Sequence, residues 1–274
     1  MRRGVTNDMA DNVQRDRLAR TLNKVPQVTI YFWIIKILAT TVGETVADFL
    51  AVNLGLGLTG TTCVTATLLL LALAIQLRAR RYIAVIYWIA VVLLSVVGTL
   101  ITDNLVDNFG IPLEITSAVF SVALATTFAA WYLSERTLSI RTICTTRREL
   151  FYWAAILFTF ALGTAGGDFL AEGLALGYAT STLLFAAAIV IIAVAHFRFG
   201  LNTVFAFWAA YVLTRPLGAS LGDLLSQSSG KGGVGFGSFG TSLLFLATIA
   251  TLIAYLSLNP QKEAIPVAAA DDES

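Results

Sequence analysis

Charged residues are scarce in this sequence. Asp, Glu, Lys and Arg together make up 13% of its 274 residues, whereas 57% are hydrophobic. A soluble domain of this size could not bury so much apolar side chain in one core, so a lipid bilayer has to cover the rest. The net charge of +1 gives no reason to expect a nucleic acid as a partner.

Residues that carry most enzyme chemistry are also nearly missing. The chain has one histidine, His196, and two cysteines, Cys63 and Cys144. It contains no HExxH motif, phosphate-binding loop or Ser/His/Asp set, so we expect no enzyme activity and no cofactor. The topology argued below puts the two cysteines on opposite sides of the membrane, which argues against a disulfide. Because the single histidine and the two cysteines lie singly at span ends or in a loop, manganese, magnesium or calcium is favoured over zinc or copper.

Long apolar runs are what the sequence has in abundance. About 30 Å of hydrocarbon requires roughly 20 apolar residues per helix, and eight stretches meet this requirement. We therefore predict an all-α integral membrane protein with eight transmembrane helices. The stretches cover residues 29–52, 60–77, 82–105, 113–133, 150–171, 179–197, 201–225 and 239–258.

Basic residues are distributed unevenly around these stretches. They gather before the first stretch and in the loops after the second, fourth and sixth, while the opposite loops contain only Lys231. Because Lys and Arg favour the cytoplasmic side, we predict that both termini are cytoplasmic. Residues 1–22 are polar, without the apolar core of a signal peptide, and residues 259–274 are expected to form a disordered cytoplasmic tail.

A fourfold internal repeat sets the predicted architecture. Each copy has a Trp, a Gly ten residues later and an Asp five residues beyond the Gly. The copies are offset by 55, 65 and 55 residues, so the longer middle loop divides the chain into two halves, 23–135 and 136–258. The repeated sets are Trp33, Gly43 and Asp48; Trp88, Gly98 and Asp103; Trp153, Gly163 and Asp168; and Trp208, Gly218 and Asp223.

The repeat predicts where these residues lie in the membrane. Each copy holds two helices, so every copy enters from the same side and the repeats are parallel. At 1.5 Å per residue, each Asp lies about 22 Å beyond its Trp, and the four Asp side chains reach one depth near the outer boundary of the hydrocarbon. We expect four hairpins to gather them around an axis, with Trp anchored at the cytoplasmic interface and Gly at close helix contacts. Solvated interface residues or helix caps are the alternative interpretation of the Asp residues.

The segments KVPQVTIYFWIIK, TTVGETVADFL, GLGLT and TRPLGASLGD carry a resemblance to known proteins. Over roughly residues 24–258 the chain resembles a bacterial family of uncharacterised membrane-anchored proteins, built from a repeated two-helix unit of unknown function. The resemblance implies a multi-pass protein of the bacterial inner membrane. It implies no particular activity, so function has to be argued from the residues.

Intramembrane charge is concentrated in the first helix of each hairpin, whereas the second helices are almost uncharged within the membrane. An ionisable group in a bilayer costs about 2.5 to 3.5 kcal/mol on insertion scales and usually faces a protein interior or a water-filled cavity. Five carboxylates and two bases leave an excess of negative charge, which protons or a bound cation must neutralise. Glu44 and Asp48 lie one turn apart on one helix face, and such stacked oxygens suit a hard cation. The charged residues are Lys36, Glu44, Asp48, Asp103, Asp168, Arg215 and Asp223.

Three features break the symmetry of the repeats. Arg215 precedes Pro216, which removes a backbone hydrogen bond and can open or kink its helix. By register Arg215 lies one turn below Glu44, which favours a buried ion pair with either a transport role or a structural one. Lys36 lies deeper and either pairs with Glu44 or marks a gate. The Gly-rich loop 226–240 suits a lid or a linker.

These patterns favour a membrane transporter for a divalent metal cation such as manganese, operating as a proton-coupled antiporter. In this hypothesis Glu44 and the four repeated Asp residues bind the metal and exchange protons, while Lys36 and Arg215 belong to the transport machinery. The expected partners are the lipid bilayer, the cation, protons and a second copy in a homo-oligomer. A cation channel and a transporter of organic solutes are further hypotheses. A non-transporting membrane sensor, scaffold or assembly factor is the alternative from a different class.

Overall fold

The computed structural model describes residues 23–259, which are helical with short connections and contain no strand. Eight helices in this part of the chain are long and apolar enough to cross a membrane. They overlap the eight predicted stretches, so the prediction of an all-α multi-pass membrane protein is confirmed. The helices are α2 (Ile30–Asp48), α3 (Gly57–Arg78), α4 (Ala84–Asp103), α5 (Leu113–Glu135), α6 (Thr146–Asp168), α7 (Tyr178–Phe199), α8 (Thr203–Ser226) and α9 (Gly237–Leu258).

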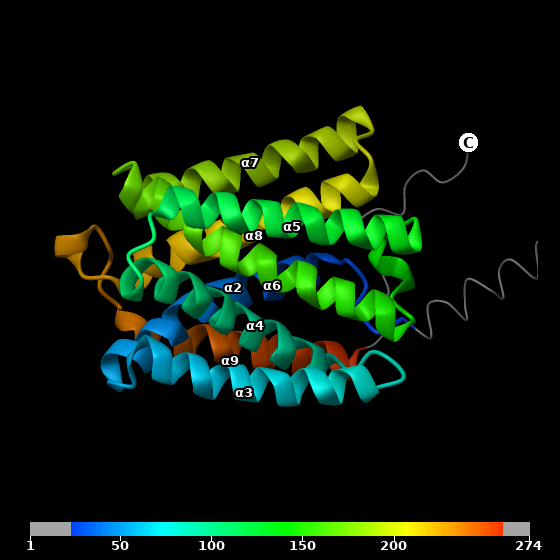
Figure 1. Ribbon diagram of the computed structural model, residues 1–274, viewed down its shortest axis with the longest axis horizontal. Helices are drawn as coiled ribbons and strands as arrows, with labels where there is room; N and C mark the ends of the chain where they lie inside the picture. The colour runs from blue at the N-terminus through cyan, green and yellow to red at the C-terminus, as the bar shows by residue number, and fades with distance from the viewer. Residues whose placement is uncertain (1–22, 260–274) are drawn as a thin grey trace, which may run out of the picture.

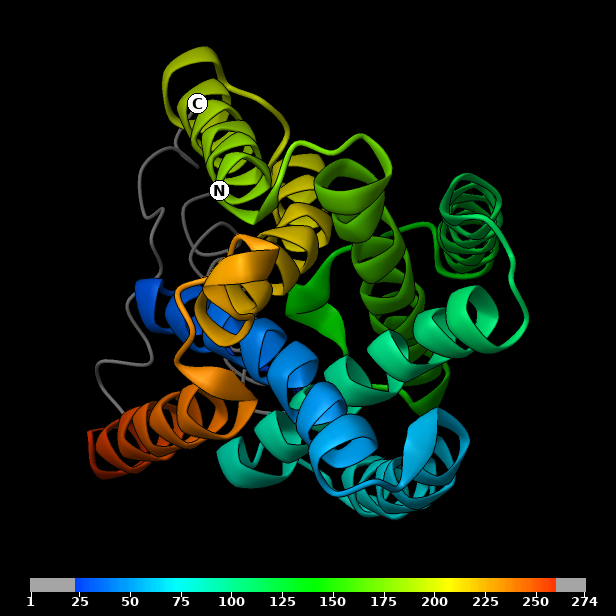
Figure 2. The same cartoon turned by 90° about the vertical axis from the view of Figure 1, so that its left-hand side faces the viewer.

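The eight helices form two concentric layers. In α2, α4, α6 and α8, 56–61% of the apolar window is buried within the protein, against 17–22% in α3, α5, α7 and α9. Figure 2 shows the first group around a common centre and the second group outside it. The side view in Figure 1 shows the helices running along one long direction, as a bundle that crosses a bilayer would. The first helix of each repeat therefore forms an inner ring, and the second helix faces lipid.

The order of contacts closes both layers into rings. Among the inner helices, α2 packs on α4, α4 on α6, α6 on α8, and α8 returns to α2. Each outer helix packs mainly on the inner helix of the following repeat: α3 on α4, α5 on α6 and α7 on α8. The last outer helix, α9, packs mainly on α2, where Ser242 donates a hydrogen bond to Thr45 at 2.7 Å. The four hairpins are thus interlocked, and the two sequence halves share one core.

The repeated glycines make this ring possible. A Cβ at any of the four would collide with a side chain on the next inner helix, so the prediction of close helix contacts is confirmed. The collision always involves the same register position, seven residues after the Trp of the following repeat. Gly43 meets Ser95, Gly98 meets Phe160, Gly163 meets Arg215, and Gly218 meets Thr40.

The repeated tryptophans lie elsewhere than expected. Trp88, Trp153 and Trp208 are buried, with exposed fractions of 2%, 4% and 5%. Trp88 makes an edge contact with Tyr87, and the Trp208 indole donates to the carbonyl of Leu138 at 2.9 Å. Anchoring of these three side chains at a lipid interface is therefore a wrong prediction, because the inner helices carry them into the protein core.

Three of the inner helices end in a π-helical turn. In the first three repeats the Asp is the last α-helical residue, and a five-residue π turn follows it: η1 (Phe49–Asn53), η2 (Asn104–Asn108) and η4 (Phe169–Gly173). In the fourth repeat α8 continues past Asp223 to Ser226, and the 3-10 turn η5 (Ser229–Lys231) lies in the loop beyond. Single π turns often occur at functional sites.

The predicted N-terminal segment 1–22 lies outside the described residues. The same holds for the predicted tail, of which only Asn259 is described.

Candidate functional site

A pocket of about 410 Å³ lies at the end of the bundle where the inner helices reach their repeated Asp residues. Seven of its lining residues carry carboxyl groups, and none is basic. All four repeated Asp residues line it, as the repeat predicted. We call it the carboxylate pocket; it is lined by Glu44, Asp48, Ala51, Val52, Gly57, Leu58, Asp103, Val106, Asp107, Leu113, Asp168, Glu172, Asp223 and Gln227.

Two layers of repeat-equivalent residues build this pocket. The inner layer is the four Asp residues, and the outer layer lies four positions later in each repeat: Val52, Asp107, Glu172 and Gln227. In three repeats the π turn connects the two layers. The sequence did not predict the outer layer, because Asp107 and Glu172 lie just past the ends of the predicted stretches 82–105 and 150–171. The spacing of four residues from Asp103 to Asp107 and from Asp168 to Glu172 was the signal that could have found it.

The carboxylates of the Asp layer have few hydrogen-bond or ion-pair partners among the described residues. Asp223 is only 8% exposed, and within residues 23–259 no hydrogen bond or ion pair reaches its carboxylate. Asp48 accepts one long hydrogen bond from the Gln227 amide, at 3.4 Å. Burying an ionised carboxylate without a partner is costly unless something neutralises it. Interface solvation alone does not describe a side chain as buried as that of Asp223.

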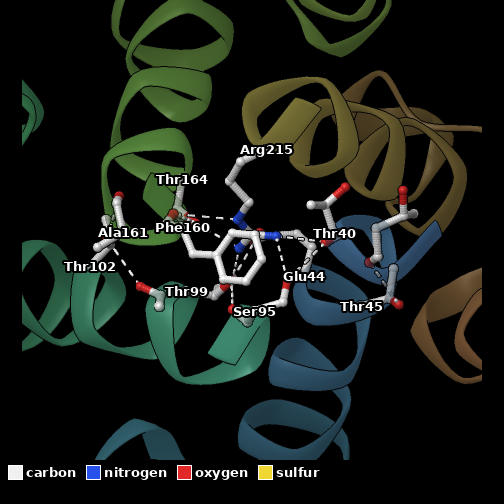
Figure 3. Close-up of polar contacts among 12 residues, drawn as sticks. Thr40, Glu44, Thr45, Ser95, Thr99, Thr102, Phe160, Ala161, Thr164 and Arg215 are labelled. Carbon is white, nitrogen blue, oxygen red and sulfur yellow. Dashed lines mark hydrogen bonds and ion pairs between the residues drawn. The ribbon is translucent and has the colours of Figure 1, made fainter. Parts of the chain in front are cut away.

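The floor of the carboxylate pocket is an ion pair between Glu44 of α2 and Arg215 of α8. Arg215 Nη2 lies 3.0 Å from Glu44 Oε2, and the exposed fractions of the two side chains are 0% and 7%. Figure 3 shows the guanidinium pointing from α8 toward α2, α4 and α6. The pair predicted from the register is confirmed. The ion pair joins the first repeat to the fourth, where the inner ring closes.

Arg215 also donates to all three other inner helices, α2, α4 and α6. Nη1 reaches the Thr40 carbonyl at 2.6 Å and Ser95 Oγ at 3.1 Å, and Nε reaches the Phe160 carbonyl at 3.4 Å. Nη2 reaches Thr164 Oγ1 at 2.7 Å and also Thr99 Oγ1. A guanidinium has five N–H donors, so six contacts use its full capacity. Thr99 and Thr164, which occupy the positions equivalent to Glu44 in the second and third repeats, thus each contribute a hydroxyl oxygen.

These contacts place Arg215 at the centre of the ring. Thr40, Ser95 and Phe160 occupy the register position of Arg215 in the other three repeats, and each of them accepts a hydrogen bond from it. One side chain can bond to all three of its equivalents only if it lies near the axis that relates them. The residue that breaks the fourfold symmetry therefore occupies its centre.

Lys36 is fully buried and does not line the carboxylate pocket. Its ammonium lies 4.2 Å from the ring centre of Tyr211 and 4.5 Å from that of Phe160, and it donates to Thr214 Oγ1 at 3.2 Å. No carboxylate in the described chain lies within ion-pair distance of it, so a Lys36–Glu44 pair is a wrong prediction. Aromatic faces stabilise the ammonium instead. Sequence periodicity could not reveal them, because both rings come from other repeats.

The arrangement of the pocket carboxylates bears on the predicted metal site. Within residues 23–259 no three His, Cys, Asp or Glu side chains are arranged to hold a metal ion together. Glu44, Asp48, Asp103, Asp168 and Asp223 therefore share a pocket without forming a ready set of direct ligands. The donors are all oxygen, which suits hard cations that keep part of their hydration shell. Direct ligation by these five residues stays a prediction.

A second buried charge cluster lies outside the carboxylate pocket. Lys24 Nζ contacts Glu149 Oε2 at 2.7 Å and the Leu77 carbonyl at 3.0 Å, and Gln76 donates to the other Glu149 oxygen at 3.1 Å. Glu149 is fully buried at the start of α6. This cluster ties the segment before α2 to α3 and α6. The sequence did not predict this cluster, because Lys24 and Glu149 both lie just before predicted stretches, at 29–52 and 150–171.

The comparisons with known proteins agree with the repeat. No curated protein sequence and no solved structure matches this chain. A family described as Repeat of Unknown Function (DUF347) matches four times, at residues 31–82, 86–137, 151–201 and 206–260. Each match begins in the first helix of one hairpin and extends through its second helix, as the spacing of Trp, Gly and Asp indicated. The chain is a four-repeat member of the Repeat of Unknown Function (DUF347) family.

Proposed function

We propose that this protein is a membrane transporter that exchanges a hydrated divalent metal cation for protons. The observation that carries the proposal is the carboxylate pocket, with seven carboxyl groups, no basic lining residue and a floor made by the Glu44–Arg215 pair. Rings of Asp and Glu attract and select cations in membrane proteins. Carboxylates that are buried beside one another also favour proton uptake when no cation is present.

The proposed ligand is a hard cation such as manganese or magnesium. Every polar lining group of the pocket offers oxygen, apart from the amide nitrogen of Gln227. Magnesium-like ions keep several waters and bind through one or two carboxylates. A volume of about 410 Å³ leaves room for such waters, which fits the lack of a three-ligand set among the described residues.

The mechanism assigns each layer a step. Asp107 and Glu172 in the outer layer attract the cation, and the four Asp residues below exchange protons for it. Glu44 and Asp48, one turn apart on α2, bind the cation at the floor. Arg215 pairs with Glu44 when the cation is absent. Proline at position 216 removes one backbone hydrogen bond next to this contact and gives α8 a place to bend.

We also propose an orientation and a location. The basic loops favour a cytoplasmic position for both termini, so the carboxylate pocket faces outward. The family resemblance favours the bacterial inner membrane. Single cysteines placed near Arg80 and Thr142 should react with an impermeant reagent only from the cytoplasm, and one near Ser229 only from outside. The opposite pattern at any of these sites would overturn the orientation.

The test is transport by purified protein in liposomes, with internal pH and manganese followed together. Wild type should move manganese one way and protons the other. The Glu44→Gln, Asp48→Asn variant should lose transport while remaining folded, because both changes remove charge and keep shape. Glu114→Gln is the matched control, an exposed carboxylate at the same end of the bundle that does not line the pocket.

The outcomes separate the function classes. Full transport by the double variant would remove the proposed site. Manganese flux without a pH change would indicate a channel or uniporter. No flux of any divalent cation by folded wild type would favour the sensor or scaffold class.

A further inference from the structure

Every hydrogen-bond acceptor around the guanidinium of Arg215 is an oxygen atom. Its ligands are one carboxylate, three hydroxyls and two backbone carbonyls, and Arg215 itself is fully buried. We call these six groups the oxygen cage: the side chains of Glu44, Ser95, Thr99 and Thr164 and the carbonyls of Thr40 and Phe160. Hard divalent cations also take six or more oxygen ligands, and these six would have to move inward from the three guanidinium nitrogens to bind one.

Three repeats supply the oxygen cage, and the fourth repeat supplies Arg215, which occupies it. α2, α4 and α6 supply all six oxygens, whereas α8 supplies none of them. Glu44 is a member of the cage and also lines the carboxylate pocket, so the two sites are continuous. Without the Arg215 side chain, the cage would be an oxygen-lined position on the axis directly beneath the pocket.

The helix that carries the occupant has features that allow it to move. Pro216, the residue after Arg215, lies inside α8 and cannot donate to the preceding turn. α8 also lacks the π turn that ends the other three inner helices, and it continues into a glycine-rich loop. A bend at Pro216 would shift the guanidinium along the axis toward the Asp layer, where carboxylates are available as partners.

We propose that the oxygen cage is an inner binding site for a hard divalent cation, which Arg215 occupies as a tethered substitute until the cation displaces it. This inference rests on the proposed transport function and adds the ligands of a second site. It also accounts for a fully buried arginine whose hydrogen-bond acceptors are all oxygen. Displacement would couple entry of the cation from the carboxylate pocket to movement of α8.

The experiment measures manganese binding to purified protein in detergent, by calorimetry and by the loss of the free-manganese spin-resonance signal. Arg215→Ala should bind one more manganese ion than wild type, or bind it at least about tenfold more tightly. Adding Thr99→Val and Thr164→Val to this variant should abolish the gain, because valine keeps the shape and removes the oxygen. Ser242→Ala, which removes a hydroxyl outside the cage, should leave the gain intact.

If Arg215→Ala does not fold, Arg215→Lys provides a second test of the inner site. Arg215→Lys keeps the charge but cannot bond to several oxygens at once as the planar guanidinium does. Manganese should displace this lysine at a lower concentration than it displaces the arginine. For Arg215→Ala, millimolar guanidinium ion should raise the thermal midpoint and compete with manganese.

Three results would overturn the inner site: unchanged manganese binding by Arg215→Ala, unchanged binding by Arg215→Lys, or rescue by guanidinium without competition. Failure of the transport proposal would look different, because wild type itself would then bind and move no manganese.

Discussion

Removing Arg215 should destabilise the protein far more than neutralising Glu44 does. Arg215→Ala leaves Glu44 charged in a buried position without its partner, a change that costs about 3 to 5 kcal/mol in buried pairs. Glu44→Gln keeps an oxygen within 3.0 Å of Nη2, and Arg215 retains its other contacts. Its expected cost is about 1 to 3 kcal/mol, typical of a weakened buried hydrogen bond.

The double variant, Arg215→Ala with Glu44→Gln, distinguishes the ion pair from general packing. It leaves no charge at the floor, so it should be more stable than the sum of the single changes implies, with a coupling energy of up to about 3 kcal/mol. The measurement is the free energy of unfolding in a detergent titration. Additive costs would refute the reasoning, because they would mean that the two groups do not interact.

The pair between Lys24 and Glu149 provides a matched control. It is buried, with a 2.7 Å contact, and it lies outside the carboxylate pocket. Lys24→Met combined with Glu149→Gln should lower stability and leave manganese transport intact. If this control removed transport as completely as changes at Glu44, then transport would depend on stability alone and not on the proposed site.

Three further predictions concern the ring and the pocket. Gly98→Ala should cost about 1 to 3 kcal/mol by overpacking against the next inner helix, whereas Gly166→Ala, with open space around its Cβ position, should cost nothing measurable by thermal unfolding. Lys36→Met should leave the protein folded, because methionine suits the aromatic surroundings, but it should uncouple manganese flux from proton flux in liposomes; tight coupling would show that this ammonium is only structural. Asp107→Asn with Glu172→Gln should slow manganese uptake several-fold at low ionic strength and much less at high salt, and an equal effect at both would contradict electrostatic attraction by the outer layer.

The sequence by itself determined the parts of this protein that the bilayer dictates. Hydrocarbon thickness requires helices of a minimum length, so eight apolar stretches give eight helices. The spacing of Trp, Gly and Asp placed the repeated residues at matching depths, because a helix rises by a constant amount per residue. Glu44 and Arg215 could be paired from their register alone, because a charge within the bilayer is costly unless an opposite charge lies at a similar depth.

Tertiary structure decided what depends on which helices are neighbours. Each outer helix packs mainly on the following repeat, which hydropathy cannot reveal because every outer helix presents a similar apolar surface to lipid. Lys36 lies against aromatic rings of other repeats, and Trp88 is buried rather than anchored at an interface. The carboxylate pocket is also a tertiary feature, because residues of all four repeats line it together. Depth along the membrane follows from counting residues, whereas position around the axis follows only from packing.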